Sequence, residues 1–261
     1  MHYVEHGDGA PVLVLHGAGV DHREMLGAIE PVFNGLSNYR RVYPDLPGMG
    51  HTPAPDTLTG ADDVLDVLLA FVDGVIGDGR FHLIGHSAGA YYARAIAGRR
   101  PDQVAGLALI CPLGEEVRDL PARQVLDAEV DPDETLGAAA ANEFRDYFVV
   151  QTQTTLDRYK EYVLPGMGLA DDAALERIGR HWSFSSGPAE GLPYTGPVLI
   201  ITGRQDSTVG YASQWDLLGH LPRATFAVLD RAGHALPHEQ PGLIKALIIE
   251  WLDRVHAMDP G

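Results

Sequence analysis

The stretch Phe81-His82-Leu83-Ile84-Gly85-His86-Ser87-Ala88-Gly89-Ala90-Tyr91-Tyr92-Ala93-Arg94-Ala95 determines how the rest of this sequence is interpreted. In it, an apolar run typical of a buried strand passes through the pattern G-x-S-x-G directly into a run typical of a helix. A serine at such a sharp turn has strained backbone geometry, and bulky side chains two residues to either side would clash there. Because Gly85 and Gly89 carry no side chains, the pattern predicts that the Ser87 hydroxyl is lifted off the sheet edge. The first amide of the helix, on Ala88, would then point to the space where an oxyanion forms.

Acyl transfer by Ser87 needs two partner residues, because a serine hydroxyl is a weak nucleophile at neutral pH. An imidazole must take its proton, and a carboxylate must hold that imidazole in the correct tautomer. We identify these partners as Asp206, which follows the apolar run 197–203, and His234, which follows the run 224–229. Both are expected at the carboxyl edge of a parallel sheet, where α/β proteins build their sites.

Other titratable side chains near these motifs are assigned elsewhere. Glu115 and Glu116, which follow the run 104–110, are the alternative acid if Asp206 does not serve. Asp45 is expected to brace its own turn, which is rich in proline and glycine. Four histidines are assigned to hydrogen-bonding or surface roles: His16, His51, His86 and His238.

The composition excludes several classes of function. A chain of 261 residues is long enough for one large α/β domain, or for a core domain with an inserted lid. Cys111 is the only cysteine, which rules out an internal disulfide and a multi-cysteine metal site, and we predict no metal and no cofactor. The formal net charge of −17 would repel nucleic acid and anionic membrane surfaces, so neither is an expected partner. With no signal-like or membrane-spanning run, the sequence predicts a cytoplasmic protein.

Strand-like and helix-like runs alternate along most of the chain. This alternation implies an α/β fold with a mostly parallel sheet, right-handed crossovers and helices on both faces. About seven strands are expected, at residues 2–6, 11–15, 39–45, 80–84, 104–110, 197–203 and 224–229. Helices are expected at residues 59–77, 88–98, 210–219 and 241–257.

The alternation breaks at 113–195, where the sequence is helical, alanine-rich and aromatic, without a strand-like run. We interpret this segment as a helical cap inserted between the two parts of an α/β core, residues 1–112 and 196–261. Asp131-Pro132-Asp133-Glu134 predicts a helix start. Further helices are expected at 152–164 and 171–182. Four residues would share one face of the first helix: Leu136, Ala140, Phe144 and Tyr147.

Three aromatic side chains of the predicted cap are candidates for substrate binding. Tyr147, Phe148 and Trp182 need packing partners, either in the core of the cap or over the cleft beside Ser87. Trp182 is the strongest cleft candidate, because the last cap helix must return the chain toward the strand that carries Asp206. We therefore expect the cap to set specificity.

Five motifs follow one another in the order of a known superfamily: HGAG at 16–19, DLPGMGHT at 45–52, GHSAG at 85–89, GRQD at 203–206 and AGH at 232–234. With them the chain resembles the α/β-hydrolase superfamily over nearly its whole length. The order Ser87, Asp206, His234 is also the order of the catalytic triad in that family. There the residue after HG supplies the second oxyanion amide, which the resemblance assigns to Ala18, with Gly19 as the alternative.

The resemblance implies a cofactor-independent serine hydrolase that cleaves a small or medium carboxylic ester through an acyl-enzyme. The alternative scissile group is a thioester or a carbon-carbon bond. Carbon-carbon hydrolases of ring-cleavage pathways tend to have Trp after the catalytic histidine, where this chain has Ala235. A second alternative is a non-enzymatic small-molecule receptor or signalling partner on the same fold. The natural substrate, its stereochemistry and the oligomeric state stay open.

Overall fold

Seven strands of the described chain form a mixed sheet in the computed structural model, which describes residues 1–114, 116–185 and 194–258. Their order is β1-β3-β2-β4-β5-β8-β9, and every neighbouring pair is parallel except β1 and β3. The predicted mostly parallel α/β sheet is therefore confirmed. The strands are β1 (Tyr3–His6), β2 (Ala10–Leu15), β3 (Tyr39–Pro44), β4 (Phe81–His86), β5 (Val104–Ile110), β8 (Val198–Gly203) and β9 (Ala224–Leu229).

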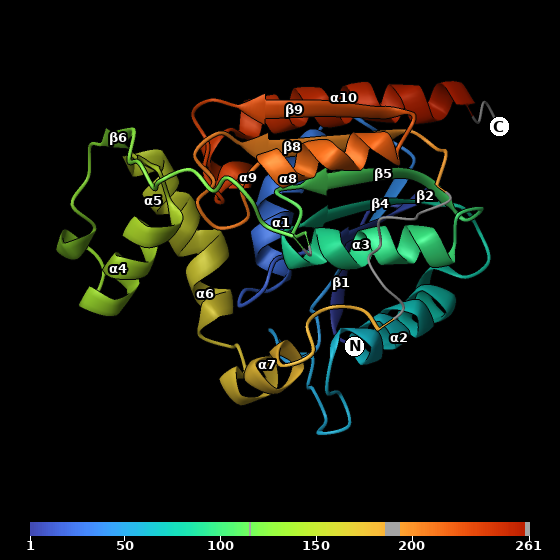
Figure 1. The fold of residues 1–261 in the computed structure, drawn as a ribbon, viewed down its shortest axis with the longest axis horizontal. Coiled ribbons are helices and arrows are strands. Elements are labelled where there is room, and N and C mark those ends of the chain that lie inside the picture. Colours follow the sequence, from blue (N-terminus) through green and yellow to red (C-terminus); the bar gives the residue numbers. More distant parts are fainter. Residues whose placement is uncertain (115, 186–193, 259–261) are drawn as a thin grey trace.

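Helices cover both faces of the sheet (Figure 1). Alternate residues of β2 show why, because Leu13 and Leu15 pack in one apolar cluster while Val12 and Val14 pack in a second cluster on the opposite face. Burial on both faces explains why the strands are almost continuously apolar. The first face is covered by α2 (Ala61–Phe71) and α3 (Ala88–Arg99), and the second by α1 (His22–Ile29) and α10 (Pro241–Met258). No helix in the described ranges is long and apolar enough to cross a membrane.

Most of the regular secondary structure described between β5 and β8 is helical. Figure 1 shows α4, α5 and α6 beyond the carboxyl ends of the strands, apart from the sheet. These helices share a small apolar cluster that includes Phe144, Phe148 and Tyr159. The helices of this segment are α4 (Ala138–Tyr147), α5 (Gln153–Arg158), α6 (Leu164–Met167) and α7 (Asp172–Gly179). The remaining short elements are α8 (Ala212–Trp215), α9 (Leu236–Glu239), 3₁₀ turns at Glu30–Val32, Pro132–Glu134 and Asp216–Gly219, and π-helical turns at Val72–Ile76 and Tyr159–Val163.

Two details of this segment differ from expectation. The start predicted at Asp131 forms only a 3₁₀ turn, and α4 begins later, because Gly137 is extended and restarts the helix as its N-cap. The segment also contains strand pairing, since β6 (Asp127–Ala128) lies parallel to β7 (Val150–Gln151). Strands of two residues carry no periodicity that a sequence pattern could reveal.

The turn from β4 to α3 holds Ser87 in the strained conformation that the sequence predicts. Its φ of 51° and ψ of −118° lie outside the regions that side-chain-bearing residues normally adopt. A Cβ on Gly85 would lie 2.5 Å from the carbonyl oxygen of Gly89, and one on Gly89 would lie 2.4 Å from that of His16. Both approaches are too close for any side chain, so the two glycines are required by packing.

Gly89→Ala tests this close packing. The added methyl group meets the backbone oxygens of Leu15 and His16, which cannot rotate away. We expect the free energy of unfolding to fall by about 1–3 kcal/mol, the usual range for overpacking. Chemical denaturation measures it.

Gly242→Ala is the matched control, because nothing lies within 4 Å of a Cβ at this position in α10. This variant should be as stable as the parent protein or more stable by up to about 1 kcal/mol. Equal stability of Gly89→Ala and the parent protein would show that the turn can accommodate a Cβ at position 89.

Candidate active site

The structure brings Ser87, His234 and Asp206 into one hydrogen-bonded row. Each follows a strand of the central sheet, because Ser87 comes after β4, Asp206 after β8 and His234 after β9. The Nε2 atom of His234 lies 2.9 Å from Ser87 Oγ, and its Nδ1 atom lies 2.9 Å from Asp206 Oδ2. The spacing matches the geometry in which an imidazole takes a proton from a hydroxyl.

Asp206 is fully buried and its carboxylate is well supplied with donors. The other oxygen, Oδ1, accepts hydrogen bonds from the amides of Thr208 and Val209 at 2.9 and 3.0 Å. Burial pushes the pKa of Asp206 upward, but the His234 imidazole and the two amides outweigh it, and the pKa lies below its ordinary value. An ionised Asp206 favours the tautomer that is protonated on His234 Nδ1, which leaves Nε2 free to accept the Ser87 proton.

Of the two alternative acids, Glu116 is not in this row. Glu116 lines a separate cavity with Arg118 and Gln214, and Glu115 lies outside the described residues.

Two backbone amides, those of Ala88 and Ala18, are the candidates for binding an oxyanion formed at Ser87. Ala88 begins α3, so its amide belongs to the helix N-terminus, where amides have no partner within the helix. In the glycine loop after β2, the Gly19 amide lies 3.2 Å from Met49 Sδ, to which it donates. The Ala18 amide has no such partner among the described residues, and Ala18 lines the pocket. Of the two candidates in that loop, Ala18 is the one left available.

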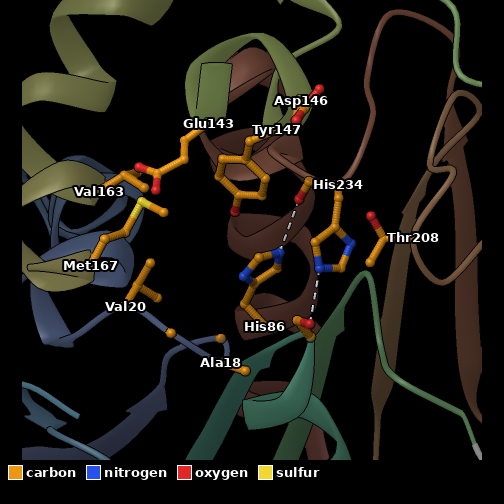
Figure 2. A pocket seen from close by; sticks show the side chains of 13 residues that line it. Ala18, Val20, His86, Glu143, Asp146, Tyr147, Val163, Met167, Thr208 and His234 are labelled. Atoms are coloured by element: carbon orange, nitrogen blue, oxygen red, sulfur yellow. Dashed lines mark hydrogen bonds between the residues drawn. The ribbon is translucent and has the colours of Figure 1, made fainter. Parts of the chain in front are cut away.

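A cavity of about 450 Å³ opens over Ser87 (Figure 2). Its lining is drawn from the glycine loop, the end of β4, the turns after β4, β8 and β9, the helices α4 and α6, and the π-helical turn before α6. The described residues that line it are Gly17, Ala18, Gly19, Val20, His86, Ser87, Glu143, Asp146, Tyr147, Val163, Met167, Thr208 and His234.

Of the three aromatic candidates, only Tyr147 lines this cavity, and its ring lies 6.1 Å from that of His234. Phe148 is instead buried in the small cluster of α4 to α6, stacked on Phe144 at 4.9 Å. Trp182 is 42% exposed beside Tyr91 of α3, since the chain after α7 runs along that helix and away from the cavity. Of the two placements considered for these residues, Phe148 has the one in the core of the cap, and neither Phe148 nor Trp182 is among the described residues that line the cavity.

Comparison with known proteins agrees with this architecture. Residues 12–247 match the model of the alpha/beta hydrolase family. The chain belongs to this family. It is a hydrolase, and the crystal structure of an alpha/beta superfamily hydrolase from Oenococcus oeni PSU-1 superposes on it with a TM-score of 0.89 at 28% identity, covering 97% of this chain and 96% of that one.

Two curated relatives have different named activities. The hydrolase is 28% identical to lipase LipV of Mycobacterium tuberculosis, over 95% of this chain and 96% of that protein. It is 26% identical to the 2-hydroxy-6-oxononadienedioate/2-hydroxy-6-oxononatrienedioate hydrolase of Burkholderia vietnamiensis, over 97% of this chain and 91% of that protein. Similarity at this level leaves the scissile bond open.

The hydrolase also buries an ion pair beside Ser87 that the sequence did not reveal. Glu24 Oε1 of α1 lies 2.7 Å from His86 Nδ1, and both side chains are almost fully buried. The other ring nitrogen, Nε2, lies 3.1 Å from the backbone oxygen of His234, to which it donates. Burial lowers the pKa of His86, but the Glu24 carboxylate raises it more, whereas His86 holds the pKa of Glu24 at about 2 against the effect of burial. The Glu24 carboxylate thus favours the protonated form of His86, and the hydrogen bond from Nε2 anchors the His234 loop.

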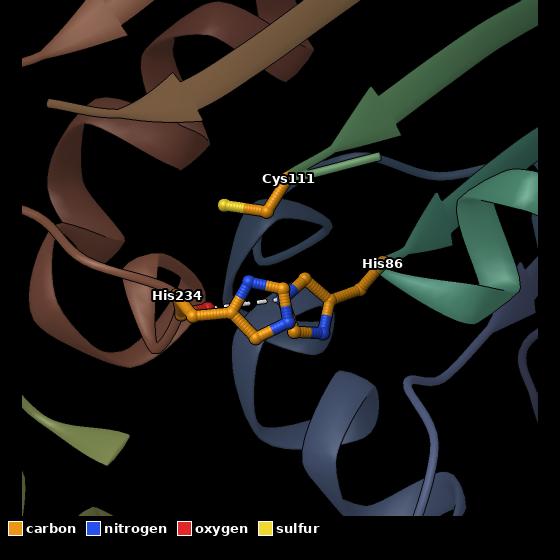
Figure 3. Close-up of side chains that lie close together, drawn as sticks. All are labelled: His86, Cys111 and His234. Carbon is orange, nitrogen blue, oxygen red and sulfur yellow. Dashed lines mark hydrogen bonds between the residues drawn. The ribbon is translucent and has the colours of Figure 1, made fainter. Parts of the chain in front are cut away.

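Within the described part of the chain, two groups of side chains have the residue types and spacing of metal ligands. Figure 3 shows the first, in which ring nitrogens of His86 and His234 and the thiol of Cys111 lie within 4.8 Å of one another. Both rings are already hydrogen-bonded, and burial raises the pKa of the Cys111 thiol well above its ordinary value, which opposes thiolate formation. In the second group, His2 and His22 each direct Nδ1 to Asp45 at 2.7 Å. These side-chain atoms already have hydrogen-bond partners within the protein, and we assign no metal to either group.

Asp45 also accepts a hydrogen bond from the amide of His51, across the turn that it was expected to brace. His16 is likewise internal, with Nδ1 2.7 Å from the Gly17 carbonyl and Nε2 accepting from the Leu46 amide. Both residues have the structural roles expected for them.

Glu239 of α9 connects the His234 loop to the segment after α4. One oxygen of its buried carboxylate accepts from the amides of Val149 and Val150 at 2.7 and 3.0 Å, and the other accepts from the Gly233 amide at 2.7 Å. The pKa of Glu239 is raised to about 7. Burial is the main cause and Asp206 adds to it, while the three amides partly offset the increase. No local pattern in the sequence pointed to this residue.

Glu239→Gln should change how stability depends on pH. In the unfolded chain a glutamate titrates near 4.5, whereas in the fold Glu239 titrates near 7. Its stabilising contribution is therefore complete below pH 4.5 and is lost as the pH rises through about 7, by up to about 3 kcal/mol. Glutamine does not titrate. The stability advantage of the parent protein over the variant, measured as the difference in their free energies of unfolding, should therefore decrease between pH 4.5 and about 7. Denaturant titration at each pH measures it.

Exposed Glu134 supplies the control, since Glu134→Gln alters the same charge outside any buried contact. Its difference from the parent should be flat with pH. A flat difference for Glu239→Gln would contradict the raised pKa.

Proposed function

We propose that this protein is a serine hydrolase that cleaves small or medium carboxylic esters. The observation that carries the proposal is the row Ser87, His234 and Asp206, with Ser87 on a strained turn beneath a cavity. In this proposal Ser87 is the nucleophile, His234 the general base and acid, and Asp206 the residue that orients the imidazole.

The reaction proceeds in two halves. Ser87 Oγ attacks the ester carbonyl while His234 Nε2 takes its proton, and the amides of Ala18 and Ala88 stabilise the oxyanion. The C–O bond to the alcohol then breaks, and His234 gives its proton to the departing oxygen, which leaves an acyl-enzyme. Water, deprotonated by His234, attacks the acyl carbon, and Ser87 departs with the returned proton as the acid is released.

The cavity supports a compact substrate. Its volume of about 450 Å³ lies in the lower part of the usual range for ligand pockets. Val20, Val163 and Met167 supply apolar surface for an acyl chain. A thioester would follow the same two steps.

A carbon-carbon bond is the other scissile group to consider, because one relative is named as a hydrolase of 2-hydroxy-6-oxononadienedioate. Ala235 after His234 speaks against it, on the resemblance described above. A receptor that keeps the same residues is distinguished by turnover: rapid, saturable hydrolysis of nitrophenyl esters favours the enzyme, and slow single turnover with ligand-dependent partner binding favours the receptor.

Labelling with a fluorophosphonate tests the nucleophile. We expect one adduct, on Ser87, and we expect Ser87→Ala to lose nearly all turnover of nitrophenyl esters while keeping the parent's unfolding midpoint. His234→Ala should lose a similar amount, since residues that act as a unit have non-additive effects. Mass spectrometry of the adduct identifies the labelled residue, and a label on another serine would refute the proposal.

Asp206→Asn tests the acid. The neutral amide favours the wrong imidazole tautomer, so kcat should fall by roughly three to four orders of magnitude with little change in KM. Glu116→Gln is the matched control and should keep the parent's kcat, because Glu116 lines a separate cavity. If Asp206→Asn retained more than about a tenth of the parent activity, the acid would have to be sought at Glu115 or Glu116.

A further inference from the structure

The cavity over Ser87 has two sides of different composition. Val20, Val163, Met167 and Glu143 lie on one side, and His234 with Thr208 lies on the other (Figure 2). The alcohol oxygen of an ester must lie within hydrogen-bond reach of His234 Nε2 in order to receive its proton. The alcohol therefore lies on the His234 side, and the acyl chain extends along the apolar side toward Glu143.

The far end of the acyl side is acidic. The carboxylate of Glu143 points toward Val163 and Met167, and Asp146 stands at the outer edge beyond Tyr147 (Figure 2). None of the described lining residues is a lysine or arginine. His86, which also lines the cavity, is paired with Glu24 at 2.7 Å, and its Nε2 atom donates to a backbone oxygen. The lining residues that the structure describes therefore offer an anionic substrate group no free lysine, arginine or unpaired His86.

Burial and negative charge together raise the pKa of two tyrosines near the cavity. Burial raises the pKa of Tyr147 well above its ordinary value, and the carboxylates Glu24, Glu239 and Asp206 raise it further. The pKa of Tyr159, whose hydroxyl lies 3.2 Å from Glu143 Oε2, is also raised by burial and then by Glu143. At Tyr159 the Glu143 carboxylate therefore disfavours a second negative charge close to its own oxygens.

We propose that Glu143 selects the charge of the acyl group, so that the site accepts acyl chains with a neutral or cationic end and discriminates against chains that end in a carboxylate. This inference rests on the proposed ester hydrolysis through Ser87. It separates the protein from its relative named for a nonadienedioate, a substrate that by its name carries two carboxylates.

The test uses three nitrophenyl esters of similar length: the butyrate, the hydrogen succinate and the 4-(trimethylammonio)butyrate. At low salt we expect kcat/KM for the succinate to be about tenfold below that for the butyrate, the scale of one unit-charge repulsion across a partly hydrated site. The cationic ester should match or exceed the butyrate. Because Glu143 is exposed to solvent, salt should screen the effect, and the ratio of butyrate to succinate should shrink as ionic strength rises.

Glu143→Gln keeps an acceptor for the Tyr159 hydroxyl and removes the charge. It should reduce the ratio of butyrate to succinate several-fold, whereas Glu134→Gln, which makes the same change of net charge on a turn that does not line the cavity, should leave the ratio as it is. A ratio that is unchanged in Glu143→Gln, or that is insensitive to salt in the parent protein, would overturn the inference while Ser87-dependent turnover continued. Loss of the proposed function would instead appear as failure to hydrolyse any of the three esters.

Discussion

The strained backbone of Ser87 is the constraint on which the rest of the site depends. A residue in this conformation costs of order 1–3 kcal/mol and persists only where its surroundings over-determine it. Here the Ser87 amide donates to Ile110 of the neighbouring strand at 2.9 Å, and its carbonyl accepts from the amides of Ala90 and Leu113. Because β4 lies inside the sheet between β2 and β5, the turn cannot relax without breaking strand pairing. The strain is thus held by the core of the fold.

Three buried carboxylates fix the His234 loop from different directions. Asp206 binds its imidazole, Glu24 acts through His86 on its backbone oxygen, and Glu239 binds the adjacent amide of Gly233. The first two have an imidazole as partner and their pKa values are lowered, whereas Glu239 has only amides and its pKa is raised. Burial of a carboxylate is compensated by a nearby positive charge more fully than by dipoles alone. The three carboxylates thus fix the loop at three points, and one of them, Glu239, titrates near neutral pH.

The fold and the row of Ser87, Asp206 and His234 could be predicted from the sequence because their signals are local. A buried parallel strand is a short apolar run, and a residue placed directly after such a run must lie at the carboxyl edge of the sheet. Glu24 and Glu239 could not be found in this way. Glu24 lies in an ordinary eight-residue helix and Glu239 ends a helix of four residues that is too short for any periodicity, and each carboxylate acts on residues more distant in sequence. Only the packing of α1 and α9 gives these carboxylates their partners.

The cap aromatics show a second limit of sequence patterns. Helical spacing grouped Phe144 and Tyr147 on one face of α4, yet Phe144 is buried in the cluster of α4 to α6 while Tyr147 lines the cavity. A helix in such a segment must cover both its own apolar cluster and the mouth of the site, so apolar residues alone do not distinguish the two surfaces. Once Tyr147 is known to line the cavity, Glu143 follows, because residues four apart share a helix face. The helical spacing of α4 therefore predicts a carboxylate in the pocket, but only after the structure has shown that Tyr147 lines it.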